Sequence, residues 1–186
     1  MDNTEKETCL ERRFTKENVS SEEGVWLLPG FPVALVCVGR NILTVAAISF
    51  FSWNPPSIMI GIVPSRYSFG LIKETGDFSV NIPEKGLIDK VKYCGSSSGR
   101  EIDKFKESNL TAVKSDKISS FLIDECPVNL ECKVIHTFEV EKASHVWFVG
   151  EVVSAHRRSD YKRKDTMIFW AHEYRSLGEV IKSSDG

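Results

Sequence analysis

Short apolar blocks alternate with polar breaks along most of the chain. These blocks are too short for long helices, are rich in β-branched residues, and are bounded by glycine, proline or asparagine, which is typical of strands. In the later blocks apolar and polar residues alternate, as in a strand with one buried face, and Gly150 is expected to form a β-bulge. The segments that read as strands are 33–38, 42–50, 57–63, 77–82, 128–134, 145–153 and 167–170.

Three helices are expected between these strands. The pattern predicts one over 66–75, with Gly76 as its stop, and another after Pro83, where apolar residues recur at helical spacing. A third, short helix is expected over 100–106. Because long helices do not separate the strands regularly, a parallel Rossmann-like sheet is disfavoured. We expect a mainly β fold with peripheral helices, in which an antiparallel sheet forms a barrel.

The length of 186 residues fits one domain with a full core, and 41% hydrophobic with 27% charged residues is ordinary for a globular protein. Residues 1–24 are polar and read as an N-terminal arm, and 25–186 read as a single domain. The arm has no apolar core of a signal peptide, and no apolar stretch is long enough to span a bilayer. We therefore expect a cytoplasmic protein without a membrane partner.

The charge pattern gives little reason to expect a nucleic-acid partner. A basic run near the end of the chain contains Arg157, Arg158, Lys162, Arg163 and Lys164, and it offers nucleic-acid binding as one hypothesis. The formal net charge is −2, however, and a charge run of this kind is usually a solvated loop. We expect no nucleic acid.

Cysteine and histidine are scattered through the chain. The five cysteines, at 9, 37, 94, 126 and 132, include no Cys-x-x-Cys pair, which predicts buried thiols in a reducing compartment. The four histidines, at 136, 145, 156 and 172, show no spacing typical of metal ligands, so no metal site is expected.

Two segments suit an anion such as phosphate. The loop 95–99 is made of glycine and serine and precedes the expected helix, on which Arg100 and Lys104 would share one face. The segment 65–68, Ser-Arg-Tyr-Ser, places hydroxyls and an arginine at the start of another helix. The alternative for each is ordinary: a surface loop, or a helix cap beside a solvated arginine.

Two other features suit a flat ligand. Small residues in the segment 41–49 would let a ring approach the backbone, and Asn41 and Thr44 could bond its polar edge. His145 stands at a strand start, where it could contact a phosphate or a ring carbonyl. A half-buried strand and a structural histidine are the alternatives.

Taken in order, these residues resemble the flavin-reductase-like proteins, particularly the flavoredoxin branch. The resemblance runs from about Pro29 to Gly178. It rests on the ordered set Asn41-x-x-Thr44, Asn54-Pro55-Pro56, Ser65-Arg66-Tyr67-Ser68, Asp77-Phe78-x-Val80-Asn81, Ser98-Gly99-Arg100-x-x-Asp103-Lys104-Phe105, Leu130-Glu131-Cys132 and His145-x-x-Phe148-x-Gly150-Glu151-Val152.

The resemblance implies an antiparallel split β-barrel that binds FMN non-covalently and forms a homodimer, with the flavin near the subunit interface. It implies that the ring lies against the strand 41–49 and that His145 and Phe169 complete the pocket. The residues implied at the ring are Asn41, Thr44, Val45, Ala46, Ala47 and Ser49; those at the phosphate are Ser65, Arg66, Ser68, Ser98, Gly99, Arg100 and Lys104. Some relatives carry a large aromatic residue where this chain has Ala47, so its flavin face is expected to be more open.

The function implied is that of an FMN-dependent oxidoreductase, a flavoredoxin or an NAD(P)H:flavin reductase. The flavin carries the chemistry, so no catalytic side chain is assigned. NAD(P)H is a candidate transient donor, and the other donors and acceptors are small molecules or redox proteins. The alternative is a flavin-binding or electron-carrier protein that does not itself oxidise NAD(P)H.

Overall fold

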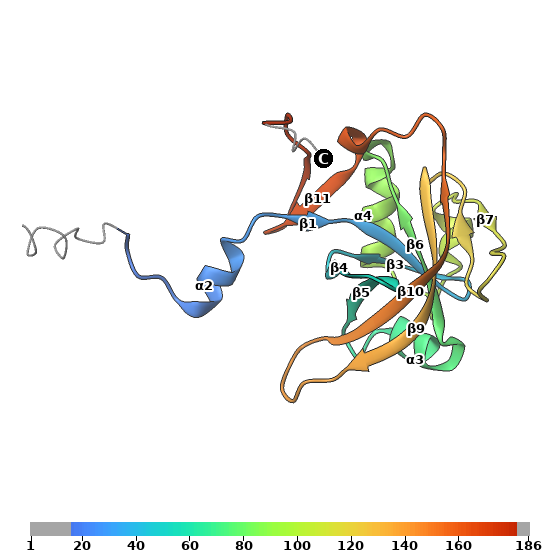
Figure 1. Cartoon of the computed structure of the whole chain (residues 1–186), viewed down its shortest axis with the longest axis horizontal. Helices are drawn as coiled ribbons and strands as arrows, with labels where there is room; N and C mark the ends of the chain where they lie inside the picture. The colour runs from blue at the N-terminus through green and yellow to red at the C-terminus, as the bar shows by residue number, and fades with distance from the viewer. Residues whose placement is uncertain (1–15, 182–186) are drawn as a thin grey trace, which may run out of the picture.

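The computed structural model describes residues 16–181, in which the main feature is a curled antiparallel sheet of seven strands (Figure 1). In spatial order the strands are β3 (Asn41–Val45), β2 (Ala34–Val38), β6 (Asp77–Ile82), β9 (Val128–Phe138), β10 (Val146–Arg157), β5 (Pro56–Ile62) and β4 (Ile48–Trp53). The two edge strands, β3 and β4, are consecutive in the chain, so the sheet curls until its edges approach each other. The expected mainly β, antiparallel split-barrel class is confirmed.

One expected strand was wrong. The segment 42–50 is divided between β3 and β4 by a turn at Ala46 and Ala47, in which the amide of Ile48 donates to the carbonyl of Ala46 at 2.9 Å. β3 and β4 form opposite edges of the sheet, so one unbroken strand could not form both. The two small residues permit the sharp change of direction between them.

The other expected strands are confirmed, although β9 and β10 each run four residues further than predicted. The pairing of β9 with β10 shifts its register between Val149 and Gly150, as the expected bulge requires. Two smaller sheets complete the fold. One contains β1 (Phe31–Pro32), β11 (Met167–Trp170) and β12 (Glu173–Ser176), and the other contains β7 (Ala112–Val113) and β8 (Leu122–Ile123).

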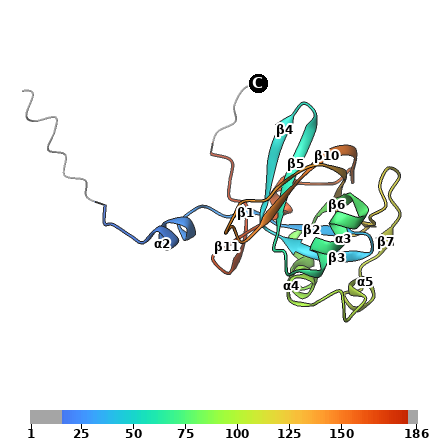
Figure 2. The ribbon, with the colours of Figure 1, turned by 90° about the horizontal axis from the view of Figure 1, so that it is seen from below.

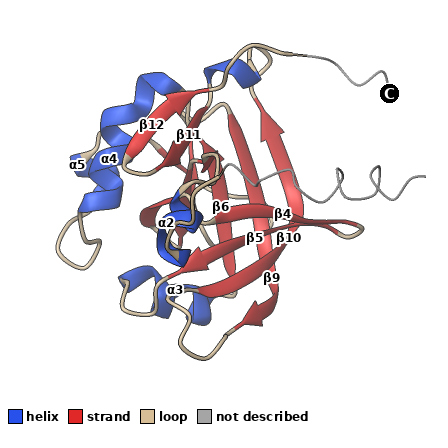
Figure 3. Ribbon diagram, turned by 90° about the vertical axis from the view of Figure 1, so that its left-hand side faces the viewer, coloured by secondary structure: helices blue, strands red, loops and turns tan. Residues whose placement is uncertain are grey.

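The helices lie around the sheet (Figure 3). They are α2 (Ser21–Trp26), α3 (Tyr67–Thr75), α4 (Ile88–Ser96) and α5 (Lys104–Glu107), with 3-10 turns η1 (Lys85–Leu87) and η2 (Arg163–Asp165). Gly76 ends α3 with φ at 68°, as expected. None of the helices within residues 16–181 combines the length and the apolar character that crossing a membrane requires. Helix α2 begins in the expected polar arm, 1–24, and runs two residues past its expected end; the first fifteen residues of the arm lie outside the described part.

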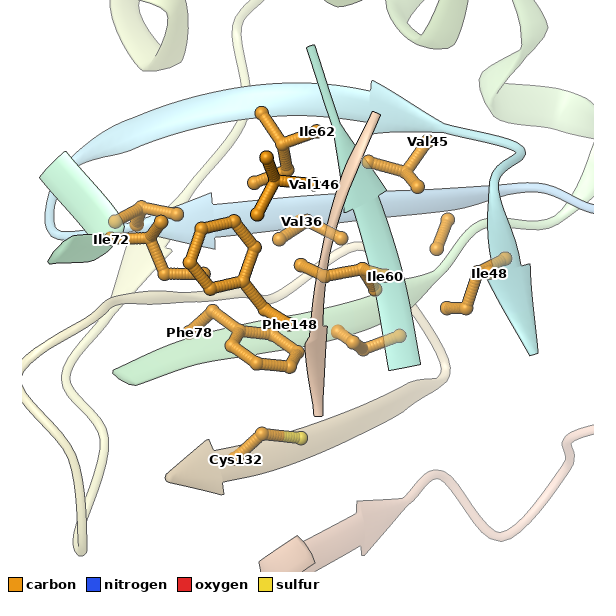
Figure 4. Packing of buried hydrophobic residues seen from close by; sticks show 13 residues of the cluster. Val36, Val45, Ile48, Ile60, Ile62, Ile72, Phe78, Cys132, Val146 and Phe148 are labelled. Atoms are coloured by element: carbon orange, nitrogen blue, oxygen red, sulfur yellow. The ribbon is translucent and has the colours of Figure 1, made fainter. Parts of the chain in front are cut away.

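The core lies on both faces of the sheet. Inside the curl, Ile60, Ile62, Phe78 and Phe148 pack together (Figure 4). A second cluster covers the other face of β2, where α4 and α5 supply apolar side chains such as Phe105. All five residues of β2 are therefore buried, which explains its unbroken apolar run. Cys37, Cys94, Cys126 and Cys132 are free and buried, as predicted, and Cys9 lies outside the described residues; the cytoplasmic location stays a prediction.

Candidate functional site

An open groove of about 1360 Å³ runs beside β3, the Ala46–Ala47 turn and β5. Every site residue predicted from the sequence lines this groove, although the residues come from segments as distant as β3, α3, the loop after α4 and β11. Figures 1 and 3 show α3 at the lower end of the sheet and β11 above it, so the groove has two ends.

The end near α3 is polar and cationic. Arg66 precedes the first residue of α3, and no side chain caps the helix. Arg100 lies across the groove, with its guanidinium 5.6 Å from the centre of the Tyr67 ring. Within residues 16–181, neither arginine has a carboxylate within ion-pair distance. An uncapped helix start beside two unpaired cations is suited to a phosphate group.

Asn41 and Gly99 are in unusually close contact at this end. The side-chain amide of Asn41 donates to the Ser68 hydroxyl at 2.7 Å, whereas its Oδ1 is buried without a hydrogen-bond partner. A Cβ atom at position 99 would lie 1.9 Å from that oxygen, so only glycine lets the loop pass here. A buried acceptor without a donor is uncommon in proteins, and a ligand that brings an N–H or O–H group would satisfy it.

Lys104 differs from its prediction. The expected helix over 100–106 begins only at Lys104, because the carboxylate of Asp103 caps it by accepting from the amides of Phe105 and Lys106. Arg100 therefore lies outside the helix, and the two cations do not share a helical face. The helix amides expected to bind an anion here are therefore occupied by Asp103, whereas phosphate contacts from Ser98, Gly99 and Arg100 stay a prediction.

The Lys104 ammonium is buried, with 5% of the residue exposed. It donates to the carbonyls of Ile42 at 2.8 Å and Cys94 at 2.7 Å, so it satisfies the C-terminal end of α4. Burial lowers the pKa of this lysine. An ammonium has three donors, and the third has no acceptor within the described residues, which leaves it for a ligand in the groove.

The middle of the groove has a floor of small residues. The amide of Gly61 donates to the carbonyl of Ala47 at 2.7 Å. A Cβ atom at Gly61 would lie 3.1 Å from the Ala47 Cβ and 3.3 Å from the Trp147 ring. The space above Gly61 is therefore filled by these side chains, whereas Ala46 and Ala47 line the groove with small side chains that would let a flat group approach the backbone there.

Two predicted polar contacts are already partly used. The Thr44 hydroxyl donates to the carbonyl of Val91 at 2.6 Å, so towards a ligand it can only accept. His145 Nδ1 is 2.8 Å from the Ser144 hydroxyl, which leaves Nε2 for a ligand.

The opposite end of the groove is aromatic, and the sequence analysis found only Phe169 there. Trp26 and Trp170 have ring centres 5.0 Å apart, and the indole N–H of Trp170 donates to the carbonyl of Trp26 at 2.9 Å. Phe31 lies edge-on to Trp170 at 4.8 Å, and Tyr174 is 4.7 Å from Phe169. Trp26 lies just after the predicted arm and Trp170 ends the last predicted strand, so only the presence of aromatic residues near both ends of the chain pointed to this wall.

A cluster outside the groove was also missed. The ligand atoms of Asp116, Glu131 and His156 lie within 4.8 Å of one another. Glu131 is fully buried and accepts from His156 Nε2 at 2.8 Å and from the Lys117 amide at 2.7 Å. Burial acts to raise the pKa of Glu131, but the hydrogen bonds from His156 and the backbone lower it. The buried Glu131 carboxylate therefore has a structural role, because its hydrogen bonds hold the loop that contains Lys117 against the sheet.

Comparisons with known proteins agree with this architecture. A family model described as flavin reductase like domain matches residues 27–178. The flavoredoxin of Desulfovibrio vulgaris (Miyazaki F) is 26% identical with a TM-score of 0.81, over 91% of this chain and 97% of that one. A flavoredoxin from Methanosarcina acetivorans has the same identity and TM-score, over 91% and 95% of the two chains.

A curated relative from Archaeoglobus fulgidus is 38% identical over 113 residues, which are 61% of this chain. The match spans 63% of that relative, less than two thirds of its length.

Proposed function

Because the chain belongs to the flavin reductase-like family, we propose that it binds FMN non-covalently and passes electrons through it as an oxidoreductase. One observation carries the proposal: a single groove combines unpaired cations, a buried acceptor without a donor, and a floor of small residues.

The polar end supports a ligand with one phosphate. Arg66 and Arg100 would supply the positive charge, and the uncapped start of α3 with the nearby serines would supply hydrogen-bond donors. FMN has one terminal phosphate, which matches the single uncapped helix start in the groove.

The middle of the groove supports a flat ring. The residues that would hold it are the small ones at Ala46 and Ala47, with the unpartnered oxygen of Asn41 as acceptor for a ring N–H. The flavin would supply the redox chemistry when bound, and the chain would bind, orient and shield it. The third donor of Lys104 and His145 Nε2 are cations or donors that would favour the added negative charge of the reduced ring.

The electron donor we propose is NAD(P)H, which would bind transiently. A second candidate is an electron carrier that takes electrons from a protein and does not oxidise NAD(P)H. The similarity to two flavoredoxins favours this candidate. Acceptors are small molecules or redox proteins.

We also propose a homodimer. The hairpin of β4 and β5 projects from the body (Figure 2) and carries what we call the hairpin patch: Phe50, Phe51 and Trp53, with Phe138 of β9 beside Phe51 at 6.3 Å. Aromatic side chains offer about 150–250 Å² each, so exposures of 42–83% leave roughly 450 Å² per copy and about 900 Å² in a symmetric pair, close to the ~1,000 Å² of a specific interface. Ser49 and Met59, at the base of this hairpin, line the groove, so a second copy would close its side.

The test of FMN binding is a titration of the purified full chain, followed by its visible absorbance and by calorimetry. We expect one FMN per chain, and a large loss of affinity in Arg66→Gln and Arg100→Gln. Arg157→Gln is the matched control, because Arg157 is exposed and lies outside the groove. A protein that takes up no FMN, or that binds it equally in all three variants, contradicts the proposal.

The two candidate functions separate in an anaerobic experiment on the FMN-loaded protein. If NADH or NADPH bleaches the flavin absorbance rapidly, the reductase is supported. If dithionite bleaches it but neither nucleotide does, the carrier is supported instead.

A further inference from the structure

The groove as a whole is larger than one ligand requires. Ligand pockets in proteins usually measure about 300–1,000 Å³, and this groove measures about 1360 Å³. A ring on the floor of small residues, with its phosphate at α3, therefore leaves the volume beside β11 for a second molecule.

The chemistry of this end is distinct. The residues that line it come from α2, β1, β11, β12 and their connections: Val25, Trp26, Leu28, Phe31, Phe169, Trp170, His172 and Tyr174. None of them is a lysine, arginine, aspartate or glutamate. Glu173 and Arg175, the nearest charges on β12, are paired with each other. Such a wall fits an uncharged flat molecule and gives the pyrophosphate of a dinucleotide no partner.

His172 adds a polar group to the wall. Its ring stacks on Trp26 with centres 5.8 Å apart and an angle of 23°. Within residues 16–181, its ring nitrogens make no hydrogen bond, so they can meet a carbonyl of a ligand.

The backbone at His172 is strained. β11 and β12 are joined by a two-residue turn in which Ala171 has φ at 49° and His172 has φ at 66°. Both central positions of such a turn favour asparagine and glycine, and other residues there cost stability. Such a conformation persists only where the surrounding structure holds it, and here the turn places the ring of His172 on this wall.

We propose that the aromatic end binds the electron acceptor, an uncharged planar ring compound with ring carbonyls, of which quinones are the type. The proposal rests on the proposed function, which supplies reduced FMN. The overall step is balanced: reduced FMN (FMNH₂) gives two electrons and two protons to the quinone, which yields oxidised FMN and the hydroquinone. Trp26 and Trp170 would stack against the ring, and His172 would donate to a carbonyl.

The experiment measures binding of 2-methyl-1,4-naphthoquinone to the full chain loaded with oxidised FMN, by equilibrium dialysis. Trp26→Ala and His172→Gly are each expected to weaken naphthoquinone binding about tenfold, the usual loss of an aromatic stacking partner, with FMN affinity within about twofold. Trp26 belongs to a helix with no buried residue, so its removal leaves the core intact. Tyr161→Ala, which changes an aromatic residue outside both the groove and the hairpin patch, serves as the control.

His172→Gly also has a readout that a purely structural role would not give. Glycine relieves the strain of the turn, so the melting temperature of the variant should be higher than that of the wild type while its affinity for naphthoquinone is lower. Unchanged naphthoquinone affinity in both groove variants overturns the proposal, as does displacement of the quinone by NADH at equal affinity. If the wild-type chain takes up no FMN, the proposed function fails, and the same dialysis without FMN still tests the aromatic end.

Discussion

The side-chain oxygen of Asn41 lies against the backbone of Gly99, at a distance that no Cβ atom at position 99 would fit. This contact fixes the loop after α4 against the start of α3, and so it sets the width of the polar end of the groove. The loop and the helix would together hold the phosphate of a flavin.

Gly99→Ala is expected to push this loop away from Asn41. Because the added methyl would lie 1.9 Å from Oδ1, we expect a loss of about 1–3 kcal/mol in the free energy of unfolding and a clear loss of FMN affinity. Urea denaturation and FMN titration measure the two effects. Gly70→Ala is the control: a Cβ there meets nothing within 4 Å, and alanine in a helix should stabilise slightly. Equal behaviour of both variants would show that the close contact has no consequence.

Lys104→Met separates two roles of the buried ammonium. Loss of its hydrogen bonds to Ile42 and Cys94 leaves two carbonyls without a donor, which should cost about 1–3 kcal/mol in the chain without FMN. If the third donor also meets a ligand, FMN will stabilise the variant less than it stabilises the wild type. Lys106→Met, an exposed neighbour on α5, should change neither quantity. If Lys104→Met lowers the stability of the chain without FMN, but FMN stabilises the variant as much as the wild type, the role of Lys104 is limited to its hydrogen bonds at the end of α4.

The buried thiols predict a loss of stability at high pH. Burial raises the pKa of Cys132 to about 12 from an ordinary value of 9.0. The folded pKa is the higher one, so the contribution is fully present below pH 9 and is lost as the pH rises towards 12. The slope should approach about 1.4 kcal/mol per pH unit for this thiol. Urea denaturation between pH 8 and 11 should therefore show a shallower decline in Cys132→Ala than in the wild type; parallel declines would contradict this assignment.

Trp53→Ser is expected to weaken self-association. Trp53 is the most exposed member of the hairpin patch, at 83%, and its indole contributes the largest share of the patch area. Sedimentation should show a dimer for the wild type and a shift towards monomer for the variant, at unchanged thermal stability of the dilute chain. Val180→Ser, which removes an exposed apolar side chain from the C-terminal segment, is the comparison. A monomeric wild type would exclude the dimer.

Most of the sheet could be read from the sequence because alternation and β-branched blocks reflect burial directly. The turn at Ala46 and Ala47 could not, since alanines between valine and isoleucine continue an apolar run and only the closing of the sheet requires a break there. The late start of α5 had a readable signal: Asp103 is a preferred cap residue, and it outweighed the four-residue spacing of Arg100 and Lys104.

The groove residues were predicted together because they follow strands and begin helices in a recognisable order. The aromatic wall was missed because Trp26 and Trp170 are 144 positions apart, and no local pattern joins them. The cluster around Glu131 was missed for the same reason. Its three members lie in a loop and two different strands, which only the folded chain brings together.

Two alanines connect the floor of the groove to the projecting hairpin. Because only two residues separate the strands, a movement of β4 is transmitted directly to Val45 and the rest of β3. A partner that binds the hairpin would therefore also displace the floor of the groove, on which the proposed flavin ring would lie. If the proposed homodimer forms through the hairpin patch, assembly would therefore also affect how the proposed flavin is held.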